Sequence, residues 1–190
     1  MSEVRAPFAA VVLAGGRSTR MGMEKALLAD RTGRTMLARQ LALLEKLRPA
    51  ELLLSARHEQ VLPKTDVSVR RLDDDGRAGP LGGIVAALQN ISCDRLLAIA
   101  VDLPLLDESV LQFLLRANGG VVPQVNGRLE PLVAVYPRRW LPEAVDALAQ
   151  GTWSLQRLLT TAIRAGTFSM LQFSDPRPFL NWNRPHDYPP

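Results

Sequence analysis

An apolar run that leads into a glycine-rich, basic segment constrains this chain more than any other feature of its sequence. Residues 8–13 are apolar and partly β-branched, which is typical of a buried strand in an α/β sheet. Two glycines follow at once, and then a group of cations: Gly15, Gly16, Arg17, Arg20 and Lys25. Glycines without Cβ atoms let backbone N–H groups approach a ligand closely, and the cations add positive charge around them. The pattern predicts a strand followed by a phosphate-binding loop.

Two better-known phosphate loops do not fit this segment. A Walker loop needs a lysine and a hydroxyl residue directly after its last glycine, whereas Gly22 is followed by Met23, Glu24, Lys25 and Ala26. The glycines also lack the G-x-G-x-x-G spacing of a dinucleotide-binding turn. A turn with solvated arginines and no ligand is the remaining alternative, and the clustering of cations disfavours it.

Length and composition indicate one domain over residues 1–190. No linker rich in glycine, serine or proline divides the 190 residues, and Cys93 is the only cysteine, so neither an intrachain disulfide nor a thiolate metal site is expected. The chain has no run of membrane-spanning length and no signal-peptide pattern, which favours a cytoplasmic protein without membrane contact. A net charge of +4 suits anionic partners. Without a basic stripe with interleaved aromatic residues, nucleic acid is not an expected partner.

Periodicity and turn signals predict an α/β fold with three layers, α/β/α, and a mostly parallel sheet. Helices are expected at 36–47, 84–88, 107–116, 140–150 and 154–164, and strands at 8–13, 52–54, 67–72 (near an edge), 96–101 (central) and 167–173. Asn126-Gly127 predicts a hairpin turn between 120–124 and 132–136. Trp153, Leu155, Leu158 and Leu159 are expected in the core rather than in a binding site.

Asp102 directly follows the most hydrophobic run of the chain. A carboxylate at the end of a central strand lies where open α/β sheets bind ligands. A helix-capping role is the alternative, but Asp107 and Ser109 are nearer to the start of the next helix. Asp102 is therefore predicted to be functional.

A second acidic group, Asp73 to Asp75, comes before Gly79-Pro80-Leu81-Gly82-Gly83 and an apolar helix. These acids could form a solvated turn. Alternatively, one carboxylate could face a ligand bound beside the glycines that follow.

These segments together resemble one family. The run L-A-G-G-R-S-T-R-M-G-M-E-K is similar to LAGGxSxRMGxxK, the signature loop of the nucleotidyltransferases that include molybdenum cofactor guanylyltransferase. Four further segments resemble the family's GPLAGI, C-D-x-P, G-x-x-x-P-L-x-x-x-Y and F-x-N-x-N-T-P-E-D motifs: G-P-L-G-G-I, V-D-L-P, G-R-L-E-P-L-V-A-V-Y and F-L-N-W-N-R-P-H-D. The resemblance covers nearly the whole chain.

The resemblance implies a Rossmann-like nucleotidyltransferase fold and Mg²⁺-dependent transfer of GMP from GTP to molybdopterin, giving the guanine dinucleotide cofactor and pyrophosphate. With the loop chemistry it predicts these nucleotide-binding residues: Leu13, Ala14, Gly15, Gly16, Arg20, Lys25, Ser55, Asp73, Gly79, Pro80, Leu81 and Asp102. Lys25 and Asp102 are expected to be catalytic, and Asp102 to hold the metal. Asn181 and Asn183 are expected to bind the acceptor. Asp73 is the best match for the aspartate near the base, with Asp74 as the alternative. Such a carboxylate could accept hydrogen bonds from the N1–H and 2-amino groups of guanine, a pair of donors that cytosine and uracil lack.

Several alternatives stay open. Ser55 stands where the family often has asparagine, which leaves room for CTP or for another phosphorylated acceptor. A non-catalytic nucleotide-binding accessory protein is disfavoured because Lys25 and Asp102 are both present. Arg128 and Glu130 are either substrate contacts or turn residues. The expected partners are GTP and molybdopterin as substrates, with transient contacts to proteins of cofactor biosynthesis or to acceptor proteins, and a monomer is expected.

Overall fold

The computed structural model describes residues 6–16, 25–29, 32–74 and 76–182. The strands are β1 (Ala9–Leu13), β2 (Glu51–Arg57), β3 (Arg70–Asp74), β4 (Arg95–Ala100), β5 (Gly120–Val125), β6 (Arg128–Leu129), β7 (Val133–Pro137) and β8 (Phe168–Phe173). The helices are α1 (Met36–Lys46), α2 (Pro80–Gln89), α3 (Glu108–Arg116), α4 (Leu141–Ala149) and α5 (Leu155–Arg164), with short 3-10 turns η1 (Lys25–Leu27), η2 (Arg138–Trp140) and η3 (Arg177–Phe179). No helix in these ranges is long and apolar enough to cross a membrane.

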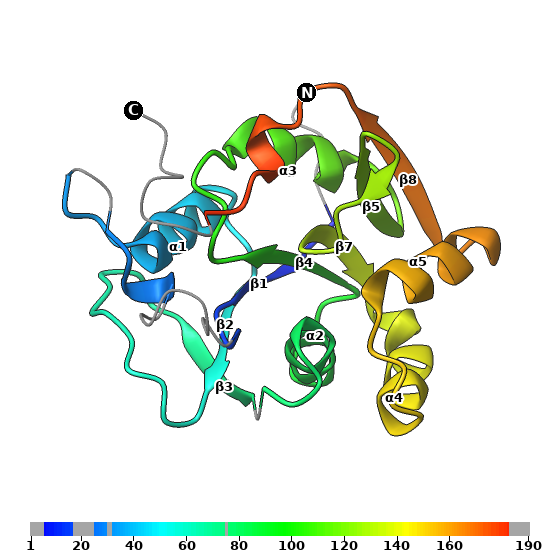
Figure 1. Cartoon of the computed structure of the whole chain (residues 1–190), viewed down its shortest axis with the longest axis horizontal. Coiled ribbons are helices and arrows are strands. Elements are labelled where there is room, and N and C mark those ends of the chain that lie inside the picture. The colour runs from blue at the N-terminus through cyan, green and yellow to red at the C-terminus, as the bar shows by residue number, and fades with distance from the viewer. Residues whose placement is uncertain (1–5, 17–24, 30–31, 75, 183–190) are drawn as a thin grey trace.

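The strands form one mixed sheet in the order β3-β2-β1-β4-β7-β5-β6, with β8 paired to β5. Strands β3, β2, β1 and β4 run parallel, β7 is antiparallel to both β4 and β5, and β8 is parallel to β5. Figure 1 shows β1 and β4 side by side in the middle of the molecule. The predicted central strand at 96–101 and edge strand at 67–72 therefore correspond to β4 and β3.

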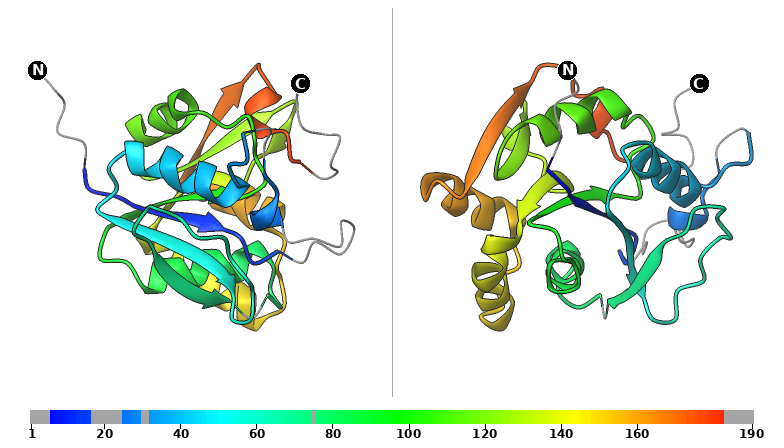
Figure 2. Two further views of the ribbon diagram at one scale, coloured as in Figure 1. Left: turned by 90° about the vertical axis from the view of Figure 1, so that its left-hand side faces the viewer. Right: turned by 180° about the vertical axis from the view of Figure 1, so that it is seen from behind.

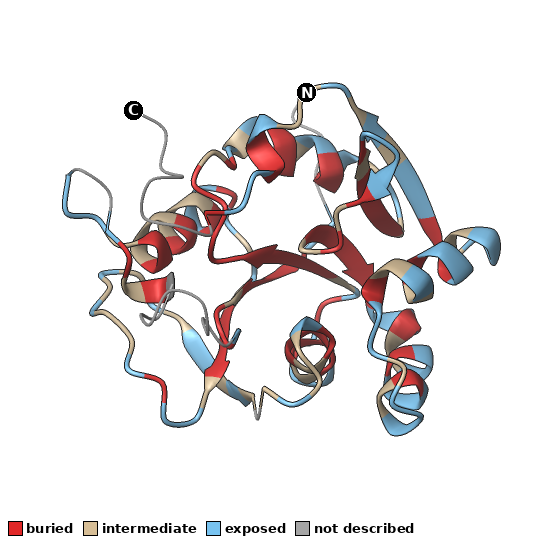
Figure 3. Cartoon of the chain, viewed as in Figure 1, coloured by how far each residue is buried: buried red, intermediate tan, exposed pale blue. Residues whose placement is uncertain are grey.

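Helices cover both faces of the sheet, as predicted. On one face Ala10 and Val12 of β1 pack in a core with α1 and α3, and on the other Ala9 and Val11 pack in a core with α2, α4 and α5. Successive side chains of a strand point to opposite faces, and a strand covered on both faces is apolar throughout. Figure 2 shows the two helical layers, and Figure 3 shows the buried residues concentrated along the sheet and the inner sides of the helices.

Local signals predicted several boundaries correctly. Thr35 caps α1, where its hydroxyl accepts a hydrogen bond from the N–H of Ala38 at 3.3 Å. The predicted turn at Asn126-Gly127 joins β5 to β6, and both residues have positive φ, 49° and 79°. Two successive residues with positive φ form the type of turn whose twist suits a two-residue hairpin.

Two strands extend further than the sequence indicated. Strand β2 continues to Arg57, so Ser55 lies within the strand rather than beyond it, and β3 ends only at Asp74. The reason is pairing between neighbouring strands: Leu13 pairs with Ser55, and Arg57 pairs with Asp74. Hydrogen bonds between these parallel strands keep Ser55 and Asp74 within β2 and β3, although the local sequence pattern assigns such polar residues to a turn.

The prediction that Trp153 belongs to the core is wrong. Its exposed fraction is 48%, whereas Leu155 and Leu159 are buried and Leu158 is partly buried. Helix α5 begins at Leu155, and Ser154 is its N-cap. Trp153 therefore precedes the first helical residue, and the helical period that buries the leucines does not apply to it.

Candidate active site

The candidate site lies where the strand order changes direction. From β1 the chain goes to β2 and β3 on one side, and it then returns to form β4 on the other side of β1. Open α/β sheets bind ligands at the carboxyl ends of the strands at such a switch point. A cavity of ≈ 270 Å³ lies there, lined by Leu13, Ala14, Gly15, Gly16, Ser55, Asp74, Gly76, Gly79, Pro80, Ala100, Val101, Asp102 and Leu132.

Hydrogen bonds from both neighbouring strands fix the start of the glycine loop. The N–H of Ala14 donates to the carbonyl of Ser55 at 2.8 Å, and the N–H of Val101 donates to the carbonyl of Leu13 at 3.2 Å. The buried amide of Gln60 donates to the carbonyl of Ala14 at 3.0 Å. The loop thus leaves the sheet in a defined direction, with Gly15 and Gly16 at the cavity.

Asp74 supplies a fixed carboxylate to this cavity. Its Oδ1 accepts a hydrogen bond from the N–H of Gly76 at 2.8 Å, and its Oδ2 accepts a long one from the hydroxyl of Ser55 at 3.3 Å. Glycines make room for this arrangement: a Cβ atom on Gly15 would lie 3.1 Å from Asp74 Oδ2, and one on Gly83 would lie 2.5 Å from Ser55 Oγ. Helix α2 and the loop after β1 can therefore both pack closely against the carboxylate.

Asp73, the first choice from the sequence, lies elsewhere. Its side chain is 56% exposed; Oδ2 lies 3.0 Å from His58 Nδ1, and Oδ1 lies 3.4 Å from Arg71 Nε. The hydrogen bond with His58 is the main reason that the pKa of Asp73 falls below its ordinary value. Leu81, also predicted to bind nucleotide, is a residue of α2 and is fully buried in the core. Neither residue lines the cavity, and Asp74, the alternative, does.

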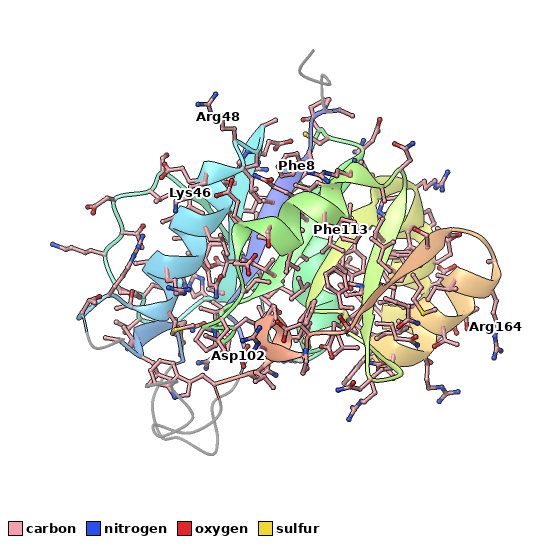
Figure 4. The ribbon with its side chains drawn as sticks, turned by 90° about the horizontal axis from the view of Figure 1, so that it is seen from above. Phe8, Lys46, Arg48, Asp102, Phe113 and Arg164 are labelled. Atoms are coloured by element: carbon pink, nitrogen blue, oxygen red, sulfur yellow. The ribbon has the colours of Figure 1, made fainter. Side chains whose placement is uncertain are left out.

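Asp102 directly follows the turn residue Val101 after β4 and is 9% exposed. Its backbone carbonyl accepts a hydrogen bond from the N–H of Trp182 at 2.8 Å, and the next carbonyl, of Leu103, accepts one from the buried Gln40 amide at 2.7 Å. Figure 4 shows Asp102 at the opposite end of the sheet from Phe8, which precedes β1. Asp102 does not cap α3, because the Asp107 carboxylate does so by accepting from the N–H of Val110 at 3.1 Å.

The carboxylate oxygens of Asp102 suit a hard cation whose other ligands are water molecules and substrate phosphates. Among the described residues no group of three or more histidine, cysteine, aspartate and glutamate side chains could hold a metal ion. Mg²⁺ keeps several waters and is commonly bound by one or two carboxylates together with substrate phosphates. The cavity beside the glycine loop has two carboxylates, those of Asp102 and Asp74, and this number fits that mode of binding.

Some predicted residues cannot be placed. Arg20, the side chain of Lys25 and Asn183 lie outside the described part of the chain, although the backbone of Lys25 begins η1. Asn181 lines a second cavity of ≈ 650 Å³, which shares Pro80 and Leu132 with the first. Its other walls come from residues 128–133, residues 153–156 and residues 179–180.

Glu130 and Trp153 also line this second cavity. Burial raises the pKa of the Glu130 carboxyl, and the charge of Arg128 opposes this shift. The segment E-P-L had pointed to Glu130 as a substrate contact or a turn residue. Nothing in the sequence distinguished Trp153 from the apolar residues of the helix that follows it.

Comparison with known proteins agrees with this geometry. Residues 10–165 match the family described as MobA-like NTP transferase domain. A probable molybdenum cofactor guanylyltransferase from Opitutus terrae is 34% identical over 98% of this chain and 96% of its own length. A molybdenum cofactor guanylyltransferase from Pseudomonas putida strain F1 is 31% identical over 84% and 85% of the two chains.

Solved structures share the fold. Molybdopterin-guanine dinucleotide biosynthesis protein A from Archaeoglobus fulgidus superposes with a TM-score of 0.69 at 23% identity, covering 94% of both chains. A nucleotidyl transferase from Methanothermobacter superposes with a TM-score of 0.73 at 23% identity, covering 96% of this chain and 94% of its own. The 2-C-methyl-D-erythritol 4-phosphate cytidylyltransferase from Thermus thermophilus reaches 0.68 at 17% identity over 94% of both chains. The predicted α/β nucleotidyltransferase fold is confirmed.

Proposed function

Because the chain belongs to the MobA-like NTP transferase family, we propose that it transfers GMP from GTP to molybdopterin and releases pyrophosphate. The product is the guanine dinucleotide form of the cofactor. The observation that carries this proposal is the cavity at the switch point, where the glycine loop after β1 meets Asp102 after β4. The names of the relatives with at least 30% identity support the choice of GTP and molybdopterin.

The reaction is an in-line displacement at phosphorus. An oxygen of the terminal phosphate of molybdopterin forms a bond to the α-phosphorus of GTP, and the bond from that phosphorus to the bridging oxygen of pyrophosphate breaks. Pyrophosphate leaves with the electron pair. No protein nucleophile is needed because the attacking group is already an anion, so the work of the protein is positioning and charge stabilisation.

The glycine loop and Asp102 divide this work. The N–H groups of Gly15 and Gly16 are proposed to bind phosphate oxygens, and the Lys25 ammonium, by resemblance to the family, to contact the same triphosphate. The Asp102 carboxylate would hold Mg²⁺, which when bound offsets phosphate charge. The backbone N–H of Trp182 donates to the Asp102 carbonyl at 2.8 Å and so helps to hold this residue in place.

The fixed carboxylate of Asp74 favours guanine over cytosine. It can accept hydrogen bonds from the paired N1–H and 2-amino donors of guanine. Cytosine presents the acceptors N3 and O2 where guanine presents that pair, and an acceptor facing a fixed carboxylate loses hydrogen bonds to water without replacement. Ser55, which holds Asp74 Oδ2, therefore serves base selection through the carboxylate.

The test is a product assay with each α-labelled nucleoside triphosphate, Mg²⁺ and molybdopterin, with a control that lacks molybdopterin. We expect GTP alone to give a labelled dinucleotide together with unlabelled pyrophosphate. Product from CTP instead of GTP would select the cytidylyltransferase alternative. GTP binding without product from any nucleotide would favour the accessory protein. We further propose a cytoplasmic monomer that contacts proteins of cofactor biosynthesis, or acceptor proteins, transiently.

A further inference from the structure

The second cavity contains two side chains that the proposed nucleotide chemistry does not use, Trp153 and Glu130. It adjoins the nucleotide cavity, because Pro80 and Leu132 line both. Asn181, predicted from the family motif to face the acceptor, lines it as well. The position is that of a group joined to the phosphate that attacks the nucleotide.

Trp153 lines this cavity and also a neighbouring pocket beside α2 and α4. Its indole is 48% exposed, and its one polar group, Nε1–H, donates a weak hydrogen bond to the carbonyl of Leu148 at 3.4 Å. The polar edge is therefore occupied within the protein, and the exposed part is aromatic surface. Tryptophan is the largest aromatic platform available to a protein, and it stacks well on flat ligands.

Glu130 presents carboxylate oxygens to the same cavity. It is half-buried, and among the described residues no hydrogen bond or ion pair engages its carboxylate. Its backbone is held on both sides, since its N–H donates to the Pro123 carbonyl at 2.8 Å and its carbonyl accepts from the N–H of Val133 at 3.1 Å. The charge of Arg128 offsets the burial of this carboxylate only in part, so donors from a ligand would stabilise it further.

The walls that carry these two residues are connected. The side chain of Gln156, in the first turn of α5 beside Trp153, donates to the carbonyl of Leu129, next to Glu130, at 2.5 Å. The buried hydroxyl of Tyr136 donates to the carbonyl of Pro131 at 2.7 Å and fixes the chain on the other side of Glu130. The backbone segments that carry the ring and the carboxylate are thus tied to each other and to the sheet.

We propose that the second cavity binds the pterin ring system of the acceptor, with the Trp153 indole stacked on the ring and the Glu130 carboxylate paired to its amino-pyrimidinone edge. This inference rests on the proposed function and names the residues that select the acceptor. A pterin is flat, and its ring N–H and amino group form a pair of donors that matches the two oxygens of a carboxylate. A phosphorylated polyol, the substrate class in the name of the Thermus thermophilus cytidylyltransferase, has neither feature.

The kinetic test compares Trp153→Leu, Trp153→Phe and Glu130→Gln at saturating GTP. Losing the stacking platform should raise the KM for molybdopterin roughly tenfold in Trp153→Leu, while phenylalanine should retain most of the affinity. Glu130→Gln, which exchanges one acceptor for a donor, should also raise this KM roughly tenfold. The KM for GTP and the Tm should not change. Phe113→Leu is the matched control, since Phe113 is an exposed aromatic residue (45%) on α3 that does not line this cavity.

A binding measurement separates this inference from the proposed function. Molybdopterin is titrated calorimetrically into the wild type and the same variants without nucleotide. Weaker binding by Trp153→Leu and Glu130→Gln supports the inference even if the wild type transfers no GMP, a result that would contradict only the proposed function. Wild-type affinity and wild-type KM in both variants, with normal turnover, would contradict only the inference. No binding by the wild type would also overturn the inference.

Discussion

Asp102 and Asp107 both lie in the segment that joins β4 to α3, and they illustrate how residues of one type take different roles. Asp102 is almost buried at the cavity of the switch point, whereas Asp107 caps α3 at the surface. We predict that Asp102→Asn lowers kcat by a factor on the order of 100 or more, because a group that stabilises charge in the transition state is lost. GTP-dependent pyrophosphate release and a thermal melt measure the two effects. A normal rate would remove Asp102 from the mechanism, and a collapsed Tm would show a structural role instead.

Asp107→Ala should show the opposite behaviour, with a loss of about 1 kcal/mol of stability at pH 7, as for a lost N-cap, and normal turnover. Burial alone would raise the pKa of Asp107, but hydrogen bonds from Ser109 and the N–H of Val110 outweigh it and place the pKa below its ordinary value of 3.8. A lowered pKa means that the stabilisation is present above 3.8 and is lost as the pH falls through the folded-state pKa. Urea unfolding of both proteins at pH 7 and pH 3 should show the difference shrinking at pH 3. An equal difference at both values would exclude the charged cap.

Helix α2 demonstrates at the scale of an element how a glycine can decide how closely a helix packs. A Cβ atom on Gly83 would lie 2.5 Å from Ser55 Oγ and 3.0 Å from Leu13 Cδ2, while one on Gly82 would meet nothing closer than 3.4 Å. Alanine normally stabilises a helix relative to glycine by about 1 kcal/mol. We predict that Gly82→Ala is neutral or stabilising, whereas Gly83→Ala destabilises by about 1–3 kcal/mol through overpacking.

The same clash should weaken GTP binding, because Ser55 must rotate away from Asp74 to admit the new methyl group. Urea titrations and GTP titrations of the two variants measure both effects. If Gly83→Ala were as stable as Gly82→Ala and bound GTP normally, the close approach of α2 would not be what fixes Asp74.

For the molecule as a whole, the sequence predicted what depends on local chemistry. The helices and strands follow from the period of the apolar residues, and the starts of α1 and α3 follow from a hydroxyl or carboxylate that caps them. The turn at Asn126-Gly127 follows from two residues that tolerate positive φ. None of these features depends on which strands pair with each other. The choice between Asp73 and Asp74 depends on pairing instead. Once β3 extends through both residues, they point to opposite faces, and only the register with Ala56 and Arg57 decides which one reaches the cavity. Trp153 escaped prediction because it precedes α5, where no helical period assigns its side chain to the core or to the surface.

Two buried tryptophans, one on each face of the sheet, test how the whole molecule holds its site. Trp182 (5% exposed) packs in the core with α1 and α3, and its backbone N–H binds the Asp102 carbonyl at 2.8 Å. Trp140 (2% exposed) packs in the opposite core, against Tyr136 and Phe168. Replacing either by alanine should lower the free energy of unfolding by about 3–5 kcal/mol.

Only Trp182→Ala should also lower turnover, roughly tenfold or more, because loosening the segment that carries Trp182 lets Asp102 move relative to the glycine loop. Rates are measured at low temperature and corrected for the folded fraction from urea titrations, so that stability and catalysis are read separately. Trp140→Ala is the matched control, with an equal cavity and no connection to Asp102. Equal corrected rates in the two variants would show that the C-terminal segment contributes packing alone, and that the loop after β4 holds Asp102 without it.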